Sequence, residues 1–354
     1  MMKFQIGCSN KKNNMKYHAL LFLLLLLASS CKTNKINTKE CSSLSSTIDS
    51  IALNNNFNGV ILVAKDSTIQ YKKAFGYSDL GNKTELKTSD LFFIGSISKQ
   101  ITAVLILREY EKGNLKLTDK INKYLPINQP WADQVTIHHL LTHTHGIVEI
   151  DQPLEFGVGT KFHYSQIGFG LLSQILEKIY HKSFEEISTN LFNEYGLKNT
   201  FHPDNKNYKH LVKGYEENKN GKLIYAEGNP VKYIAAGGLI SNVEDILKWN
   251  KLLYSGKLVK STTLDLMRTR FATRVHPIFD EIEYGYGLLF KDKQQNIEIG
   301  AFGYSPGFPS AAYYYPQTNM NLIVLENIGV HLDDFKQTFK VHTDLMDLIK
   351  NLKL

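Results

Sequence analysis

Strand-like segments lie at both ends of this chain, and helical patterns occupy the long stretch between them. Residues 59–65 (GVILVAK) and 68–76 flank a short turn, which is typical of a β-hairpin. After about residue 280 the pattern becomes strand-like again, over residues 284–291, 297–304, 310–315 and 322–326. This order predicts one sheet assembled from the N-terminal and C-terminal parts. A mostly helical lobe, about residues 115–225, is inserted between them, and a cleft is expected at the junction.

Hydrophobic periodicity and capping residues predict where the helices lie. Ser183 and Ser241 each precede a glutamate by three residues, which is the pattern of a capping box. The fold class is therefore α/β, of the α+β type. We expect helices over residues 136–143, 165–180, 183–195 and 241–253, and a closing amphipathic helix over 334–352.

A serine and a lysine three residues apart give the first chemical signal. Ser96 and Lys99 stand where an apolar segment turns into a helix, which ends at Gly113. A serine at a helix N-terminus has backbone N–H groups directed at developing negative charge, and the residue three further on projects from the same face. Lys99 would take a proton from Ser96 if its amine is partly desolvated. Ser-x-x-Lys occurs twice more in the chain, but only here does it follow a glycine at such a junction.

Residues 1–31 are typical of a bacterial export signal. Lysines precede an apolar stretch from Ala19 to Ala28, which is too short to span a bilayer, and small residues then lead to Cys31. These small residues resemble the lipobox of bacterial lipoproteins, in which the cysteine is lipidated; an ordinary cleaved signal is the alternative. We therefore expect an exported, periplasmic protein with a lipid anchor in a bacterial membrane. Residues 32–46 would be a polar linker.

Cysteine and charge content exclude several kinds of function. The three cysteines all lie at or before residue 41, so the rest of the chain has no disulfide, thiol nucleophile or thiolate metal site. The formal net charge of +7 falls to +3 without residues 1–30, because these hold four of the 41 basic residues and none of the 34 acidic ones. This excess is too small to indicate a nucleic-acid partner.

Six segments, in order along the chain, resemble one known family. They are FFIGSISKQITA (92–103), VTIHHLLTHTHGI (135–147), FHYSQIGFGLLSQILEKI (162–179), LFNEYGLKNT (191–200), AAGGLISNVEDILKW (235–249) and YGYGLLF (284–290). From about residue 50 to 350 the chain resembles the serine hydrolases related to class C β-lactamases and low-molecular-weight penicillin-binding proteins.

The resemblance implies a fold and a reaction. The fold would be β-lactamase/transpeptidase-like over residues 47–352, with an antiparallel sheet flanked by helices and an inserted all-helical lobe. The reaction would be hydrolysis of a small-molecule or peptide ester or amide through an acyl-enzyme. An esterase, a D-amino-acid peptidase or carboxypeptidase, and a β-lactamase-like enzyme all remain open. Neither a metal nor an organic cofactor is expected.

The resemblance also assigns catalytic residues. Ser96 is the acyl-accepting nucleophile and Lys99 its partner. Tyr164 stands at the tyrosine of the family's Tyr-x-Asn motif, whose phenol oxygen assists proton transfer to and from the serine. Such a role needs neighbouring positive charge, and Lys99 is the available source. The third position of the motif is Gln166 instead of asparagine, so its contact with the substrate could shift or be lost.

A third motif departs further from the family pattern. Where the family has Lys or His, any residue and Gly, this chain has Ala301, Phe302 and Gly303. Ala301 can neither donate a hydrogen bond nor carry charge, which favours an ester or amide with no carboxylate requirement. The backbone N–H groups of Tyr304 and Ser96 should form the oxyanion hole, and backbone donors survive changes of side chain.

Gly303-Tyr304-Ser305-Pro306-Gly307 also fits the nucleophile elbow Gly-x-Ser-x-Gly, with His331 or His342 downstream. The elbow needs the N–H of the residue after the serine, and Pro306 has none. A helix should follow the elbow, whereas the following residues are strand-like.

Two further alternatives concern a metal site and a protein without catalysis. His138, His139, His143 and His145 crowd one segment, and His139 and His143 lie one helical turn apart. A metal site would need a third ligand, and the Glu of His-Glu-x-x-His is absent, so a packed or surface role is favoured. His145 stands where the family has serine. A non-catalytic relative that binds a cell-wall fragment or a protein partner is suggested by Ala301 and Gln166. The joint retention of Ser96, Lys99, Tyr164 and Gly303 favours catalysis.

Overall fold

The computed structural model describes residues 38–66, 68–205, 209–226, 234–291 and 298–352. Met1–Ser46 and Thr47–Leu354 are two separate units, and the fold and site below belong to the second. The predicted export signal, residues 1–31, lies outside the described residues. From residue 38 on, the predicted linker is helical and forms the start of α2 (Thr38–Asn54).

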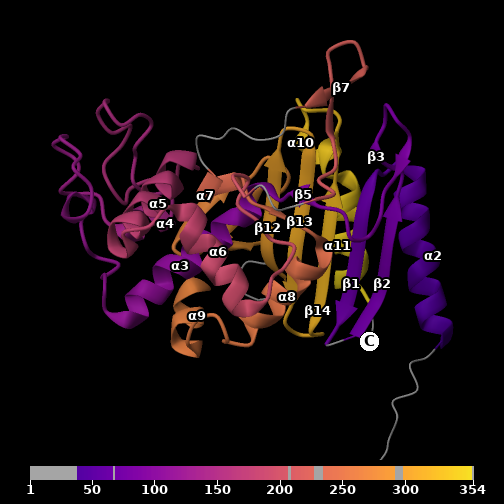
Figure 1. The fold of residues 1–354 in the computed structure, drawn as a ribbon, viewed down its shortest axis with the longest axis horizontal. Helices are drawn as coiled ribbons and strands as arrows, with labels where there is room; N and C mark the ends of the chain where they lie inside the picture. The colour runs from indigo at the N-terminus through magenta and orange to yellow at the C-terminus, as the bar shows by residue number, and fades with distance from the viewer. Residues whose placement is uncertain (1–37, 67, 206–208, 227–233, 292–297, 353–354) are drawn as a thin grey trace, which may run out of the picture. The chain divides into compact units, whose positions relative to one another are not determined.

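An eight-stranded antiparallel sheet forms the centre of the second unit, with the strand order β2-β1-β14-β13-β12-β11-β10-β9 (Figure 1). The N-terminal hairpin joins the C-terminal strands through β1 and β14, where Gly59 pairs with Glu326 and Lys65 with Met320. The sheet is therefore assembled from both ends of the chain, as predicted. The strands are β1 Gly59–Lys65, β2 Thr68–Phe75, β9 Ala272–Val275, β10 Glu281–Tyr284, β11 Leu289–Phe290, β12 Ile299–Ser305, β13 Phe308–Tyr315 and β14 Met320–Glu326.

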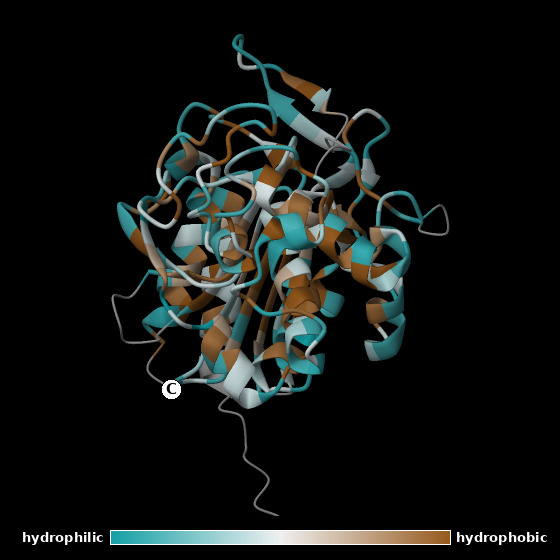
Figure 2. Cartoon of the chain, turned by 90° about the vertical axis from the view of Figure 1, so that its left-hand side faces the viewer, coloured by the Kyte–Doolittle hydropathy of each residue, from teal (hydrophilic) through white to brown (hydrophobic). Residues whose placement is uncertain are grey.

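The central strands are buried on both faces. In β1 and β14, six of seven residues are buried, which explains why these segments are largely apolar and do not alternate. Helices α8 (Val243–Tyr254) and α11 (Lys340–Lys350) both contact β14. Figure 2 shows apolar residues concentrated along these strands and on the neighbouring helices.

The helices that separate the two parts of the sheet gather beside it, at the left of Figure 1. Their ends follow the predicted signals: Ser183 forms a capping box with Glu186, and Gly113 and Gly196 end helices in the left-handed conformation. The helices here are α3 Ser98–Lys112, α4 Ile137–Leu141, α5 Gln166–Tyr180, α6 Phe184–Tyr195 and α7 Ile234–Gly237. The other short helices are α9 Ser261–Met267, α10 Phe335–Thr338, and the 3₁₀ turns η1 Gly95–Ile97 and η2 Ile121–Lys123.

The end of the predicted helical lobe is a β-hairpin. β6 (Gly214–Glu217) and β7 (Leu223–Ala226) pair with each other, and β6 also pairs with β15 (Ile328–Gly329). The side chain of Asn218 closes the hairpin turn by accepting the N–H groups of Asn220 and Lys222. Two further small sheets pair β3 (Tyr77–Asp79) with β4 (Thr84–Glu85) and β5 (Phe92–Phe93) with β8 (Ile240–Ser241).

Two helix predictions were wrong in detail. α8 is capped by Asn242 and not by Ser241, because the Asn242 side chain accepts the N–H of Asp245. The closing helix is two helices, α10 and α11, which meet at Phe339, where the backbone leaves helical geometry (φ −102°, ψ 19°).

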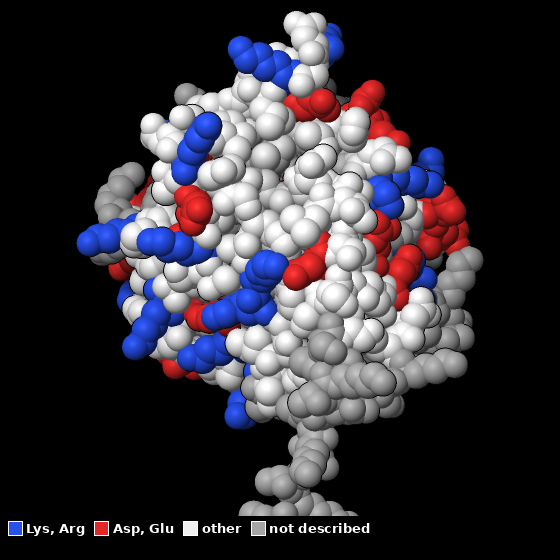
Figure 3. Space-filling view, turned by 90° about the vertical axis from the view of Figure 1, so that its right-hand side faces the viewer, with Lys and Arg blue, Asp and Glu red and all other residues white. Residues whose placement is uncertain are grey.

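No helix within the described ranges is both long and apolar enough to cross a membrane. Basic and acidic side chains both occur on the face shown in Figure 3.

Candidate active site

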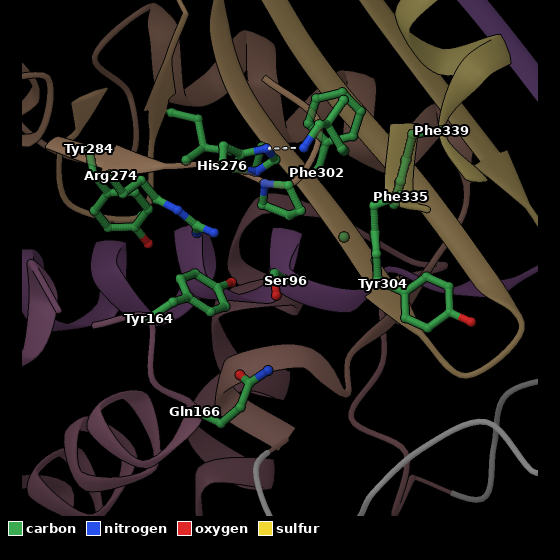
Figure 4. Close-up of a pocket in the computed structure, with 16 residues that line it drawn as sticks. Ser96, Tyr164, Gln166, Arg274, His276, Tyr284, Phe302, Tyr304, Phe335 and Phe339 are labelled. Carbon is green, nitrogen blue, oxygen red and sulfur yellow. Dashed lines mark hydrogen bonds between the residues drawn. The ribbon is translucent and has the colours of Figure 1, made fainter. Parts of the chain in front are cut away.

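Ser96 lies in a tight junction between a strand and a helix. η1 follows β5 and leads directly into α3, so the serine occupies a 3₁₀ turn just before the predicted helix. Ser96 is partly exposed, whereas its neighbours from Leu91 to Gln100 are buried. It lines a cavity of about 290 Å³ (Figure 4). The hydroxyl is therefore presented to a small, partly open cavity by a buried segment of backbone.

Two glycines allow β12 to approach this junction. A Cβ on Gly95, whose φ is +50°, would lie 2.4 Å from the backbone N of Tyr304. A Cβ on Gly303 would lie 2.2 Å from the carbonyl oxygen of Ile94. Ser310 adds a hydrogen bond of 3.0 Å from its Oγ to that same oxygen. The backbone N–H groups of Ser96 and Tyr304 are thus held on adjoining segments, and a side chain at either glycine would push these segments apart.

Lys99 is almost fully enclosed, with 1% of its surface exposed. Its Nζ donates to the Oγ of Ser96 (3.1 Å), the Oε1 of Gln166 (2.7 Å) and the carbonyl oxygen of Ala236 (2.6 Å). All three partners are uncharged. Burial lowers the pKa of Lys99 and outweighs the opposing effect of Tyr164, and among the described residues no carboxylate contacts the amine to stabilise its charged form.

The partners of Lys99 fix where its lone pair points when the amine is neutral. A neutral amine has two N–H groups and one lone pair. The oxygens of Gln166 and Ala236 can only accept, so they take the two N–H groups. Ser96 can donate its hydroxyl proton, and so it faces the lone pair. The geometry suits removal of the Ser96 proton by Lys99.

Tyr164 stands between two cations at the edge of the same cavity. The Nζ of Lys99 lies 4.6 Å from the centre of its ring, and the guanidinium carbon of Arg274 lies 4.8 Å from it. Figure 4 shows the Tyr164 hydroxyl directed toward Ser96. The phenol is therefore placed beside both the serine and the lysine.

His143 holds the backbone beside Tyr164. Its Nδ1 accepts the N–H of Ser165 at 3.1 Å, so the proton of the neutral ring is on Nε2, which faces the hydroxyl of Tyr284 at 3.1 Å. Burial, followed by the charge of Lys99, lowers the pKa of His143 well below its usual value. The neutral imidazole also packs against the Tyr164 ring, with 4.6 Å between ring centres.

The other three histidines of this segment also have partners within the protein. His138 Nδ1 lies 2.8 Å from the hydroxyl of Tyr286, and His139 Nδ1 accepts the N–H of Thr136 as part of the cap of α4. His145 Nδ1 accepts the N–H of Ile147 at 2.9 Å. This last bond is local, between residues two positions apart.

The cavity brings several of the predicted residues together and adds others. Gln166, Ala301, Gly303 and Tyr304 line it together with Ser96 and Tyr164. Sequence reasoning missed a basic side and an aromatic wall. The only local signal was a concentration of arginines, three of the chain's four lying between residues 268 and 274. The additional lining residues are Arg274, His276, Pro277, Ile278, Tyr284, Gly287, Leu289, Phe302, Phe335 and Phe339.

The nucleophile elbow does not form. Ser305 is the last residue of β12, is 2% exposed, and is followed by a turn into strand β13 instead of a helix. His342 is fully buried. The Nδ1 of His331 lies 3.8 Å from the Oε2 of Glu217, and neither residue lines the cavity beside Ser96.

One group among the described residues has the composition of a metal site. Glu185, His202 and Asp204 bring potential ligand atoms within 4.8 Å of one another, beside a second cavity of about 500 Å³. His202 Nδ1 accepts the N–H of Asp204, however, so the ring carries its proton on Nε2. Neither nitrogen then offers a free lone pair, and we assign no metal to this group.

Comparisons show what this chain is similar to. The model of the Beta-lactamase family matches residues 51–344. Penicillin-binding protein 4* of Bacillus subtilis is 26% identical over 319 residues, covering 77% of this chain and 68% of that protein. The teichoic acid D-alanine hydrolase of Staphylococcus aureus (strain MRSA252) is 23% identical over 275 residues, covering 72% of this chain and 68% of that protein. The solved structure of D-amino acid amidase from Ochrobactrum anthropi SV3, complexed with L-phenylalanine amide, has a TM-score of 0.76 at 20% identity, covers 88% of this chain and 99% of that chain, and shares the fold.

Proposed function

Because the chain belongs to the Beta-lactamase family and is a serine hydrolase, we propose that it cleaves an ester or amide through an acyl-enzyme formed on Ser96. The observation that carries this assignment is the set of partners around Lys99. Two carbonyl acceptors occupy the N–H groups of the neutral amine, and the hydroxyl of Ser96 is the partner that can give up a proton.

In the acylation step, the Oγ of Ser96 forms a bond to the substrate's carbonyl carbon while its proton passes to the Nζ of Lys99. The backbone N–H groups of Ser96 and Tyr304 stabilise the carbonyl oxygen as it becomes negative. When the bond to the leaving group breaks, the leaving group takes a proton from the hydroxyl of Tyr164. Lys99 then returns the first proton to Tyr164.

Deacylation reverses this path with water in place of the leaving group. The water oxygen bonds to the acyl carbon, and its proton passes through Tyr164 and Lys99. The acyl–Oγ bond breaks, and Ser96 regains its proton. No step requires a carboxylate or a metal from the protein.

The substrate is proposed to be a small molecule or a short peptide segment. The cavity, at about 290 Å³, is at the lower end of the range for small-molecule sites. The names of the relatives are compatible with this size, since one acts on the D-alanine of teichoic acid and another is a D-amino acid amidase.

Export and anchoring are a separate proposal, supported by sequence alone. Residues 1–31 would direct export, Cys31 would carry the lipid, and the segment that follows would tether a periplasmic domain. Cys31→Ala should move the protein from the membrane fraction to the soluble fraction of the producing cell. Equal membrane retention of both proteins would contradict the lipid anchor.

The hydrolase assignment is tested by turnover of a phenyl ester, an amino acid amide and a chromogenic β-lactam. Ser96→Ala should lower turnover of any accepted substrate by on the order of 10³-fold or more while keeping the melting temperature. Ser89→Ala, at an exposed serine, is the matched control and should leave turnover unchanged. A folded wild-type protein that turns over none of these substrates would support the non-catalytic alternative, a binding protein for a cell-wall fragment or a protein partner.

A further inference from the structure

The cavity beside Ser96 contains a cation with no acidic partner. Arg274 lines this cavity, and no Asp or Glu is among the lining residues. Within the described part of the chain, Arg274 contacts the carbonyl oxygen of Val275 at 3.4 Å and the rings of Phe162 and Tyr164, and it interacts electrostatically with Tyr284 and His276. No carboxylate is among these partners, so the half-buried guanidinium has lost water without gaining an anion in exchange.

His276 supplies a second donor next to Arg274. The two residues are two positions apart, at and just beyond the end of β9, and both line the cavity, whereas Val275 between them is 83% exposed. This is the alternation expected of extended backbone. His276 Nδ1 accepts the N–H of Ile278 at 3.1 Å, so the neutral ring carries its proton on Nε2.

We propose that Arg274 and His276 form a binding site for a carboxylate of the substrate, and that this site supplies the charge that Ala301 lacks. The inference rests on the proposed hydrolysis at Ser96. The planar fork of a guanidinium matches a carboxylate, with two parallel N–H donors for two oxygens. The expectation that the substrate has no carboxylate requirement is thereby replaced.

An aromatic wall of the cavity, which begins beside His276 at Phe302, completes the description of the substrate. Phe302, Phe335 and Phe339 line it, with ring centres 5.1 Å apart between Phe302 and Phe339 and 5.9 Å apart between Phe335 and Phe339. This wall offers apolar surface and no charge. The substrate is therefore a small ester or amide that carries one carboxylate and one apolar group, with the scissile carbonyl at Ser96.

A test must separate substrate binding from an effect on Tyr164, because Arg274 contacts both the cavity and that ring. An effect on Tyr164 slows the reaction of every substrate. An effect on a carboxylate site changes the ratio of kcat/KM between carboxylated and neutral substrates. The informative quantity is thus kcat/KM for a carboxylated ester divided by kcat/KM for its neutral analogue.

The experiment uses the full-length protein and a matched set of 4-nitrophenyl and phenyl esters. One ester is neutral, one has a carboxylate on the acyl chain, and one has a carboxylate on the leaving group. Two further esters carry a phosphate in place of each carboxylate. We expect one carboxylated ester to be preferred over its neutral analogue by about 10- to 100-fold, and Arg274→Gln to abolish the preference. Arg274→Lys should keep part of it. Arg268→Gln, at an arginine that contacts Tyr254 outside the cavity, should keep all of it.

Several results would overturn the assignment. The first is the absence of a carboxylate preference in the wild-type protein. The second is an undiminished preference in Arg274→Gln, and the third is a stronger preference for the phosphorylated esters. A binding measurement covers the case in which no ester is hydrolysed and the proposed function itself fails. Sodium hexanoate should raise the melting temperature of Ser96→Ala, and hexanamide should not. Equal effects of the two compounds, or an equal hexanoate effect after Arg274→Gln is added, would contradict the carboxylate site.

Discussion

The Nζ of Lys99 lies 3.1 Å from the Oγ of Ser96, and within the described part of the chain no carboxylate contacts this amine. A lysine in that position is not held in its charged form by an ion pair. Burial lowers its pKa, and the opposing effect of Tyr164 is smaller. The proposed chemistry depends on this relationship, since only the neutral amine can accept the serine proton.

The rate of acylation should therefore rise with pH and level off above the pKa of Lys99 in the folded protein, which lies below the ordinary 10.5. Single-turnover acylation measured from pH 5 to 10 checks this. A rate that is flat or falls across the range in which the protein stays folded would contradict a lysine base. In Lys99→Met the rising limb of the pH–rate profile should disappear and the acylation rate should fall about 10²- to 10⁴-fold. Lys112→Met, on the last turn of the same helix, should keep the rising limb and the wild-type rate.

The same lowered pKa makes folding stability depend on pH. Between the folded pKa of Lys99 and the unfolded value of 10.5, the unfolded chain binds more protons at this residue, so the free energy of unfolding rises with pH in that window. The rise should be absent in Lys99→Met. Denaturant unfolding at a series of pH values measures it, and parallel profiles for the two proteins would exclude the effect.

Gln166→Glu should convert the uncharged shell of Lys99 into an ion pair. A carboxylate within hydrogen-bonding distance favours the charged amine, so the pKa of Lys99 rises and the rising limb of the pH–rate profile moves to higher pH. Activity at neutral pH should fall at least about tenfold. Gln166→Met, which removes the contact without adding charge, is the control and should not move the limb upward. An unchanged limb in Gln166→Glu would mean that Lys99 does not set it.

Gly95→Ala should disrupt the site, because the new Cβ would meet the backbone N of Tyr304 at 2.4 Å in addition to requiring a φ of +50°. Gly113→Ala isolates the second effect, since Gly113 has a φ of +79° and nothing within 4 Å of its Cβ position. The control should lose about 1–2 kcal/mol of unfolding free energy and keep its activity. Gly95→Ala should lose more stability and acylate at least about 100-fold more slowly. Equal behaviour of the two variants would show that β12 does not press on the serine turn.

His143→Asn should loosen Tyr164. Asparagine tolerates the positive φ of 59° at this position but cannot reach both the N–H of Ser165 and the hydroxyl of Tyr284. A buried N–H without a partner costs about 1–3 kcal/mol, and turnover should fall for every substrate alike. His181→Asn, at an exposed histidine with a φ of 52°, is the matched control and should change neither the free energy of unfolding nor turnover. Wild-type turnover in His143→Asn would remove His143 from the support of the site.

Local patterns in the sequence were sufficient for the parts of the fold and site that depend on neighbouring residues. Ser96 and Lys99 meet because residues three positions apart on the serine turn and the following helix lie on the same face. The capping box at Ser183 likewise depends on four consecutive residues. Each of these could be predicted from a segment of a few residues.

Features that depend on distant contacts could not be predicted in this way. Arg274 reaches Tyr164 only because β9 closes the far edge of the sheet beside the helical lobe, and no local pattern marks that contact. The hairpin β6–β7 is stabilised by pairing with β15, more than 100 residues away. The cap of α8 was misjudged because Ser241 and Asn242 are both suitable caps, and Ser241 is instead used in the strand pairing of β8 with β5.

The central claim is that Ser96 is a working nucleophile, and intact-mass analysis after exposure to a fluorophosphonate tests it most directly. The wild-type protein should gain the mass of one phosphonyl group, localised to the peptide that contains Ser96, and Ser96→Ala should gain none. A full adduct on folded Ser96→Ala, or no adduct on folded wild-type protein, would contradict the claim.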